Sequence, residues 1–505
     1  MEKLNYLIAL LFVGGLVFLS ACKEDDPDPI KASPTISVTP TTAGVLPGEK
    51  VDFTVTTSAA TGAKVVSVKA NDGTTDETVS GNTYSYTVPA AAAANATITI
   101  TFTVTDDQTP AKTGKTTATI TVGEVIDPVI PAGVISADRT LTSGVIWELD
   151  GRVIVGDGVT LTIEAGTIIK AHEGTDTDAS VLIIARGGKI DAQGTAEEPI
   201  IMTSIKDNIT IGEKMGTNLA DDANSLWGGL IVLGKAPGSF KADATEVQIE
   251  GIPPSDTNGL YGGDNPTDNS GVIKYISIRH GGVTIGEGNE INGLTLGAVG
   301  SGTVIENVEV VANQDDGIEF FGGTVNPKNL LVWGAGDDGL DVDQAYSGTI
   351  TNSMVILGAA SDHGLEIDGG EGSATGKFTM DGITLIGNQD TDKGEYADFR
   401  SNAMGTTKNV YAIGFKDNSD VELDKENNVS ANYTNGDLLF EKWEIVLPTG
   451  VATSAELFKD TTDPVQSTFT SDAATFSSAV TAGEETVGAN QADFSWTFAK
   501  AKGAF

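Results

Sequence analysis

The chain has 505 residues, more than one ordinary domain, and its 30 Lys and Arg against 70 Asp and Glu give a formal net charge of −40. This charge excludes a nucleic-acid-binding protein, because the phosphate backbone needs cationic partners. It also disfavours an electrostatic hold on anionic membranes or polyanionic substrates without a bridging metal. A hydrophobic fraction of 39% suffices for an extended core, and a single cysteine excludes a disulfide framework or a cysteine-based zinc site.

An export signal and a lipid anchor are predicted at the N-terminus. The apolar run Leu7–Leu19 is too short for a membrane span of about 20 residues, and it leads into Leu-Ser-Ala-Cys. We predict a signal peptide at 1–21 and lipidation of Cys22, because this ending resembles a bacterial lipobox. Residues 22–34 form an acidic tether that resembles the surface-export signal of Bacteroidota lipoproteins; an ordinary charged linker is the alternative. The resemblance implies a protein anchored in the outer membrane and facing outward.

Residues 35–123 have the pattern of a small antiparallel β-sandwich. Short runs with period-two alternation, such as VDFTVTT and ATITITFTVTD, are separated by Pro-Gly, Asn-Asp-Gly and Gly-Asn turns. Their number and spacing resemble bacterial Ig-like or PKD modules, which implies a spacer. A linker punctuated by proline follows at 124–133.

Residues 134–429 have the pattern of a right-handed parallel β-helix, so the predicted fold class is all-β, a β-helix preceded by an Ig-like sandwich. In 304–370 an apolar run, a small-residue turn, an acidic pair, Gly and a short strand occur three times. The acidic turns begin at Asp315, Asp337 and Asp362, spacings of 22 and 25 residues. Units of this size stack, because each is too small to bury its own core. Residues 430–505 lose the period and are expected to cap the stack or pack on its side.

The strand after each acidic turn alternates apolar and acidic residues, as in Leu340-Asp341-Val342-Asp343. Carboxylates should therefore point out of the coil, in columns whose members lie about 4.8 Å apart. Like charges opposite one another destabilise a sheet, so such a column needs a cation, shifted pKa values or a ligand. We predict a Ca²⁺-supported face formed by two columns, Glu319, Asp341 and Glu366 in one and Asp343 and Asp368 in the other, with Asp316, Asp338 and His363 stacked in the preceding turn. The alternative is a solvated acidic face whose turn residues Asp315, Asp337 and Asp362 bond backbone N–H groups.

A second hypothesis is glycoside hydrolysis. The turns Asn313-Gln314-Asp315, Asp337-Asp338 and His363-Gly364, followed by Arg400, resemble in order the motifs of polygalacturonase-type hydrolases. The resemblance implies Asp338 as the acid that protonates the leaving oxygen and Asp315 and Asp337 as the groups that activate water. The chain departs from the pattern, since Asp, not Gly, precedes His363 and Ser-Asn follows Arg400 where x-Lys is expected.

Two further sets of residues are candidates for carbohydrate chemistry. A polysaccharide lyase, the third hypothesis, needs a positioned basic residue, for which Arg279, Lys393 and Arg400 are candidates. Aromatic rings that stack on sugars are a further requirement of many binding sites, and the candidates are Trp147, Trp227 and Trp333. The strand context of Trp333 and Trp227 favours core burial instead.

Several phrases, among them LWGGLIVLGKAP and DDGIEFFGGTVNPKNLLVWGAGDDGLDVDQ, resemble a family of bacterial surface lipoproteins with a right-handed β-helix of the pectate-lyase-like superfold. The resemblance covers about residues 134–500. We expect a binding or adhesion module for carbohydrate, with Ca²⁺ as a structural ion and an extracellular polysaccharide or another surface protein as partner. A carbohydrate-active enzyme is the alternative.

Overall fold

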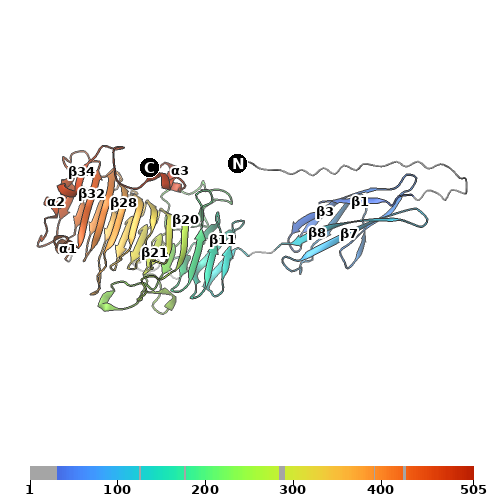
Figure 1. The fold of residues 1–505 in the computed structure, drawn as a ribbon, viewed down its shortest axis with the longest axis horizontal. Coiled ribbons are helices and arrows are strands. Elements are labelled where there is room, and N and C mark those ends of the chain that lie inside the picture. Colours follow the sequence, from blue (N-terminus) through green and yellow to red (C-terminus); the bar gives the residue numbers. More distant parts are fainter. Residues whose placement is uncertain (1–30, 124–126, 176–177, 284–290, 392, 425–427) are drawn as a thin grey trace, which may run out of the picture. The chain divides into compact units, whose positions relative to one another are not determined.

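The computed structural model describes residues 31–123, 127–175, 178–283, 291–391, 393–424 and 428–505. The predicted signal peptide, Cys22 and the tether up to residue 30 lie outside these ranges. The chain divides into two compact units, which meet between Asp127 and Pro128 (Figure 1). Within the described ranges, none of the helices has the length and apolar character needed to cross a membrane.

The first unit is a β-sandwich of two sheets around one core. Phe53 from one sheet and Phe102 from the other are both fully buried, with ring centroids 5.5 Å apart. One sheet contains β1 (Thr35–Thr39), β3 (Lys50–Ser58) and β6 (Thr83–Thr87); the other contains β2 (Thr42–Val45), β8 (Thr113–Val122), β7 (Thr97–Asp106), β4 (Val65–Asn71) and β5 (Asp76–Thr78). The expectation of purely antiparallel pairing was wrong at one edge, where β2 runs parallel to β8. Pro40 interrupts the chain between β1 and β2, since proline has no N–H for a ladder, and the chain then passes to the other sheet.

The second unit is a parallel β-helix, as predicted, in which a 24-stranded sheet winds through successive rungs (Figure 1). Each rung contributes to three faces. Face 1 contains β10 (Arg139–Leu141), β12 (Thr160–Ile163), β15 (Lys189–Gln193) and the first halves of β20 (Gly271–Arg279), β22 (Val304–Val311), β24 (Lys328–Trp333), β26 (Thr349–Ile356), β28 (Phe378–Ile386), β30 (Gly405–Ile413) and β32 (Leu438–Ile445). Face 2 contains the start of β11 (Ile146–Val155), β13 (Ile168–Ala171) and β16 (Ile200–Ser204). It continues with the second halves of the even-numbered strands from β20 to β32, whose first halves lie in face 1, and ends with β34 (Ser477–Ala479).

Face 3 carries the acidic strands of the sequence repeat. It contains the end of β11, β14 (Val181–Ile184), β17 (Leu230–Leu233), β21 (Leu294–Gly297), β23 (Ile318–Phe321), β25 (Leu340–Asp343), β27 (His363–Ile367), β29 (Glu395–Phe399), β31 (Val421–Leu423) and β33 (Phe458–Asp460). Their alternate apolar residues point inward. Ile318, Phe320, Leu340, Val342 and Leu365 are at most 1% exposed and belong to one continuous core.

We expect Leu340→Ala to destabilise the β-helix by about 2–5 kcal/mol, because the fully buried side chain leaves a cavity that a stacked core closes only partly. Ile211, which is 52% exposed, provides the matched control, and Ile211→Ala should stay within about 0.5 kcal/mol. Chemical denaturation measures both. Equal effects of the two substitutions would contradict the assignment of Leu340 to the core.

Asparagines mark the bend between faces 1 and 2. Asn307, Asn329 and Asn352 occupy the same position on β22, β24 and β26, with left-handed φ values of 57°, 57° and 51°. Asparagine tolerates this conformation better than other residues with a side chain. The Asn329 amide donates to Asn307 Oδ1 at 2.8 Å, and the Asn352 amide donates to Asn329 Oδ1 at 2.6 Å. This ladder fixes the bend from rung to rung.

Both predicted ends of the β-helix require correction. β9 (Val129–Ile135) already pairs in parallel with β11, so residues 129–133 belong to the stack and not to the linker. Beyond the predicted end at 429, β32, β33 and β34 continue the faces to residue 479. These rungs do not show the repeat pattern in the sequence, because they lack the acidic turn and are interrupted by α1 (Val429–Asn435) and α2 (Phe469–Phe476). Aromatic rings of both helices, such as Tyr433 and Phe469, pack together at this end.

A long excursion between β17 and β20 covers part of the outer side of face 3. It contains η2 (Lys241–Asp243), β18 (Val247–Gln248), η3 (Thr257–Gly259) and β19 (Leu260–Tyr261). Its Phe240 and Tyr261 are 2% exposed and join an outer apolar cluster with Ile183, Ile231 and Phe321 of the face. The excursion therefore stands beside the acidic strands that follow β21.

Candidate functional site

Two columns of polar side chains run along face 3 and form the candidate site. We call the first the strand column: Thr295, Glu319, Asp341, Glu366, Asp398 and Glu422 lie opposite one another on β21 to β31. We call the second the turn column: Asn292, Asp316, Asp338, His363 and Glu395 precede or begin the same strands. The predicted stacking of Glu319, Asp341 and Glu366 is confirmed.

The turn column stacks because each carboxylate bonds the backbone of the next rung. Asp316 Oδ1 accepts the N–H of Asp338 at 2.9 Å, and Asp338 Oδ1 accepts the N–H of His363 at 2.7 Å. The glycine after each acidic pair has a steric reason: a Cβ on Gly317 or Gly339 would lie 2.2 or 2.3 Å from an inner valine. The Asp-Asp-Gly pattern thus serves the turn itself, while its second Asp is placed beside the strand column.

The most crowded part of the site is the group Asp316, Glu319 and Asp341, which we call the carboxylate triad. Their oxygen atoms lie within 4.8 Å of one another. Burial, followed by the repulsion among these carboxylates and their acidic neighbours, raises the pKa of all three well above the ordinary value. The alternative of a solvated acidic face does not hold for this group, since Asp316 and Glu319 are each only 7% exposed. Their side chains form no ion pair with Lys, Arg or His among the described residues.

Unsatisfied polar atoms border the carboxylate triad. Asn292 is fully buried and donates its amide to Glu319, but its Oδ1 has no hydrogen-bond partner within the described ranges. The same holds for Oδ1 of Asp341. Buried polar atoms are nearly always satisfied, so these oxygens indicate a missing donor or cation. Hard oxygen atoms of this kind suit Ca²⁺.

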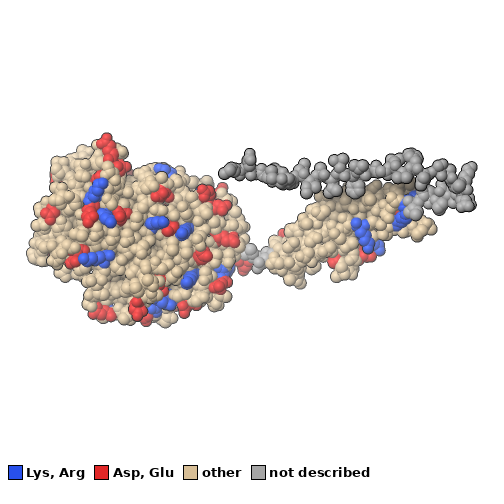
Figure 2. Space-filling model, viewed as in Figure 1, with Lys and Arg blue, Asp and Glu red and all other residues tan. Residues whose placement is uncertain are grey.

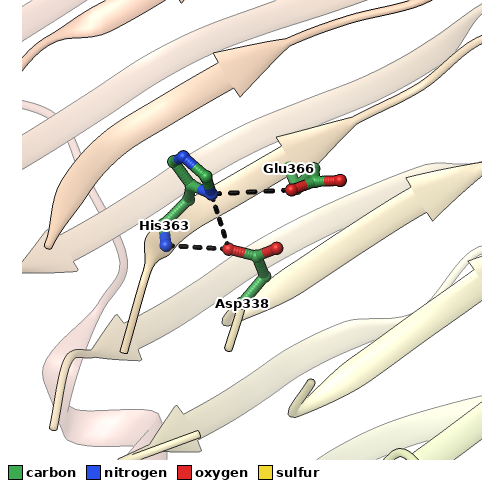
Figure 3. A group of neighbouring side chains, drawn as sticks. All are labelled: Asp338, His363 and Glu366. Carbon is green, nitrogen blue, oxygen red and sulfur yellow. Dashed lines mark hydrogen bonds and ion pairs between the residues drawn. The ribbon is translucent and has the colours of Figure 1, made fainter. Parts of the chain in front are cut away.

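A second group on the next rungs, Asp338, His363 and Glu366, is already compensated (Figure 3). His363 Nδ1 lies 2.8 Å from Asp338 Oδ1 and 3.5 Å from Glu366 Oε2. Burial opposes protonation of His363, but the hydrogen bond to Asp338 and the charges of Asp338, Asp362 and Asp398 outweigh it and raise the pKa to about 9. This raised pKa favours the protonated ring in the metal-free protein, so a metal ion at this group would have to displace that proton.

Cationic side chains pair with two of the other predicted ligands, Glu366 and Asp368, and with two of the turn residues, Asp337 and Asp362. Arg400 forms ion pairs with Glu366 and, at 3.4 Å, with Asp368. Lys393 lies 2.9 Å from Asp362 and 3.9 Å from Asp337. Glu366 and Asp368 are thus less suited to a metal than predicted, and the carboxylate triad is the set that fits one. Asp343 lies beside Asp368 and buried surroundings raise its pKa to about 7.

The predicted catalytic residues and the predicted metal ligands form one network. Asp315, Asp316 and Asp337 place oxygens within 4.8 Å of one another, and Glu366 connects His363 to Arg400. Asp338 is 3% exposed and is occupied by the two hydrogen bonds from His363, which does not suit a freely accessible acid.

The basic residues and tryptophans considered from sequence lie elsewhere or are engaged. Arg279 is 2% exposed, and the hydrogen bond to Asp362 raises the pKa of Lys393, so neither is a free base for a lyase. Trp147 and Trp227 are buried in the core. The expectation for Trp333 was wrong: alternation along β24 turns it outward, where it packs under Phe498.

Three acidic residues of the later rungs were missed from sequence. Asp398 and Glu422 continue the strand column, and burial raises the pKa of Asp398 to about 8. Glu395 continues the turn column, and burial beside Asp420 raises its pKa to about 7. The alternation Ala397-Asp398-Phe399 and Val421-Glu422-Leu423 carries the same signal as the recognised repeats, without the acidic turn before it.

On the face of the molecule shown in Figure 2, acidic and basic side chains of the β-helix unit are scattered among uncharged residues. The carboxylate triad is therefore distinguished by burial and proximity, and not by a single-sign patch on that face.

Comparison with known proteins agrees with this architecture. Among curated proteins, none matches the chain. The crystal structure of the catalytic unit of a thermostable GH87 α-1,3-glucanase from Streptomyces thermodiastaticus is similar at 12% identity over 86% of this chain and 84% of that chain, with a TM-score of 0.22. The model of the pectate-lyase-like β-helix domain matches residues 133–498, most of the second unit and nearly three quarters of the chain. The chain belongs to the family of pectate-lyase-like β-helix domains.

Proposed function

We propose that the chain is a surface-exposed, lipid-anchored glycan-binding protein whose acidic face is completed by a divalent cation, Ca²⁺. The observation that carries the proposal is the carboxylate triad: three acidic side chains with oxygens within 4.8 Å of one another, and no cationic side chain paired with them among the described residues. Without compensation, such a group is destabilising when ionised. Asp316, Glu319 and Asp341 would hold the ion, which would also provide a positive point for hydroxyl groups of a ligand.

Three features support a glycan as the ligand, and the first of them favours a neutral one. The net charge of −40 and the further carboxylates of both columns repel polyanions. Polar side chains continue along the strand column over six rungs, which suits an extended polymer. The family name, pectate-lyase-like β-helix domain, refers to an enzyme of polysaccharide metabolism and supports a polysaccharide in general, charged or neutral. The predicted signal at 1–21, Cys22 and the acidic tether support outer-membrane anchoring and outward display.

A carbohydrate-active enzyme is the second candidate, and one observation favours it. Burial, together with neighbouring carboxylates, raises the pKa of Asp398 to about 8 against the opposing charge of His363, and raises the pKa of Asp343 to about 7. A protonated and an ionised carboxyl on one face are what acid–base hydrolysis of a glycoside needs.

Glycan-array binding of the purified protein, in Ca²⁺ and in EDTA, tests the proposal. We expect binding to neutral glycans in Ca²⁺ and a loss of at least about ten-fold in EDTA or in Asp341→Asn, which corresponds to about 1.4 kcal/mol. Asp150→Asn is the control, because Asp150 is an exposed acid on an early rung.

Two other results decide between the candidates. Retained binding in EDTA would contradict a cation-supported site. Release of reducing ends from a bound glycan, abolished by Asp398→Asn, would replace the binding module with the hydrolase.

A further inference from the structure

The last twenty residues of the chain return across the stack. After β34, at the far end of the β-helix, the chain reaches η5 (Gln491–Phe494) and α3 (Phe498–Lys502), which lie over its middle rungs (Figure 1). We call residues 486–505 the C-terminal strap. Its contacts follow one order, with Thr486 on Glu444 of β32, Gly488 on Asn409 of β30, Ala489 on Thr384 of β28, Asn490 on Asn352 of β26, and Phe498 on Glu309 of β22.

Specific polar contacts hold the strap to three successive rungs, at β30, β28 and β26. Its backbone N–H groups donate to Asn409 O at 3.0 Å, to Thr384 Oγ1 at 2.8 Å and to Asn352 Oδ1 at 2.6 Å. Asn352 also donates its amide to Asp493 of the strap at 3.0 Å. The strap therefore forms hydrogen bonds with the asparagine ladder next to Gly382. This glycine occupies the next position of the ladder, which has no side chain there.

Glu309 holds the strap through both of its carboxylate oxygens. It is fully buried, and its two carboxylate oxygens accept the N–H groups of Phe498 and Ala499 at 3.0 and 2.8 Å. Ser277 donates to the same carboxylate at 2.6 Å, and Arg279 lies 4.4 Å from the centroid of the Phe498 ring. Two of the three hydrogen bonds to this buried carboxylate come from the strap, so an undocked strap would leave its charge poorly satisfied.

The strap also covers an apolar strip on the outer side of face 2. Leu331, Met354 and Ile356 point away from the main core, yet they are at most 5% exposed. Phe494 and Ala499 of the strap complete their cluster. The strip explains why outward positions of β24 and β26 are apolar while those of face 3 are acidic.

We propose that the C-terminal strap docks on the completed β-helix and locks the rungs from β20 to β32 into one cooperative unit, with Glu309 as its latch. In a stacked repeat each rung contacts only its neighbours, so rungs can open independently from either end. The strap adds contacts between rungs that are far apart in the stack, and opening one of them then requires release of the strap.

The latch also reaches the acidic site. Phe498 packs against Val311 and Ala312, which lead directly into the turn that carries Asp316. Strap docking should therefore help to hold the carboxylate triad in place. This consequence rests on the proposed function; the locking of the rungs does not.

Amide hydrogen exchange of the full chain tests the strap. In Glu309→Gln and in Phe498→Ala we expect amides of residues 488–499 and of β22 to β26 to exchange at least ten-fold faster than in the unaltered protein. Glu484→Gln is the matched control, because Glu484 is exposed just before the strap. Unchanged exchange in both latch variants, or faster exchange confined to the strap, would overturn the proposal.

A cut in the folded protein provides a test that does not depend on the stability of a latch variant. A specific protease site inserted between Gly483 and Glu484 lies in an exposed loop. After cleavage, the strap should co-elute with the β-helix in gel filtration, and Phe498→Ala should release it. Immediate release from the unaltered sequence would contradict docking. Both readouts omit Ca²⁺ and glycan, so failure of the strap and failure of the proposed function are distinguishable.

Discussion

Asp341→Asn is expected to raise the thermal midpoint of the cation-free protein and to abolish its response to Ca²⁺. In the unaltered protein, Ca²⁺ at 100 times its Kd should add about 2.7 kcal/mol, a rise in the thermal midpoint of about 3 °C for a unit of this size. Asn has nearly the shape of Asp but removes one of three crowded carboxylates, which should stabilise the cation-free state by about 1 kcal/mol. Differential scanning calorimetry with EDTA and with Ca²⁺ measures both effects.

Asp341→Asn should raise the thermal midpoint of the cation-free protein and remove the stabilisation by Ca²⁺, and these opposite effects make the test selective for a binding residue. A residue that merely packs would lose stability under both conditions. Asp150→Asn, at an exposed position, should leave both the midpoint and the Ca²⁺ response unchanged. An Asp341→Asn protein that is less stable in EDTA and still responds to Ca²⁺ would refute the carboxylate triad as the binding site.

The cation-free protein is also expected to lose stability as the pH rises from about 5 to 9. Asp343, Asp398 and Glu395 have folded-state pKa values raised to about 7, 8 and 7, chiefly by burial. The native state therefore binds more protons than the unfolded state across this window, so the free energy of unfolding falls with pH. The imidazolium of His363 acts in the same direction, because its contribution is complete below its unfolded pKa of about 6.5 and is lost as the pH rises through about 9.

Carboxyl groups with lowered pKa values determine how stability falls at acidic pH. Hydrogen bonds and ion pairs outweigh burial at Glu306, Glu444 and Asp460 and lower their pKa values, so their contribution is present above the unfolded pKa of about 4 and lost below it. We therefore expect maximal cation-free stability near pH 5. Ca²⁺ should flatten the decline at higher pH, because it stabilises the ionised form of the carboxylate triad.

Thermal unfolding in EDTA at one-unit steps from pH 4 to 9 measures this profile. Asp398→Asn removes one titrating group and should make the decline shallower by several degrees across the range. A cation-free protein whose midpoint rises or stays level between pH 5 and 8 would show that these carboxyls are not protonated in the native state.

The sequence alone determined the β-helix and the register of its acidic strands. A period of 22 to 25 residues and the alternation of Leu340-Asp341-Val342-Asp343 leave little choice, because a strand places successive side chains on opposite sides. Glu319, Asp341 and Glu366 were therefore stacked correctly from sequence. The same rule extended to later rungs would have found Asp398 and Glu422.

Only the tertiary structure decided which carboxylates are compensated. Arg400 follows Glu366 by 34 positions, and no pattern in the chain states that these two charges meet. The repeat did predict that Asp338 and His363 stack, but not that their side chains form an ion pair. The burial of Glu319 was not predictable from the sequence either, because its outward side chain is covered by side chains of other rungs, such as Asn292. The path of the C-terminal strap was not predictable either, since it depends on contacts between Phe498 and residues almost two hundred positions earlier. Local alternation fixes which way a side chain points, whereas its partners and its exposure depend on segments that only the folded chain brings together.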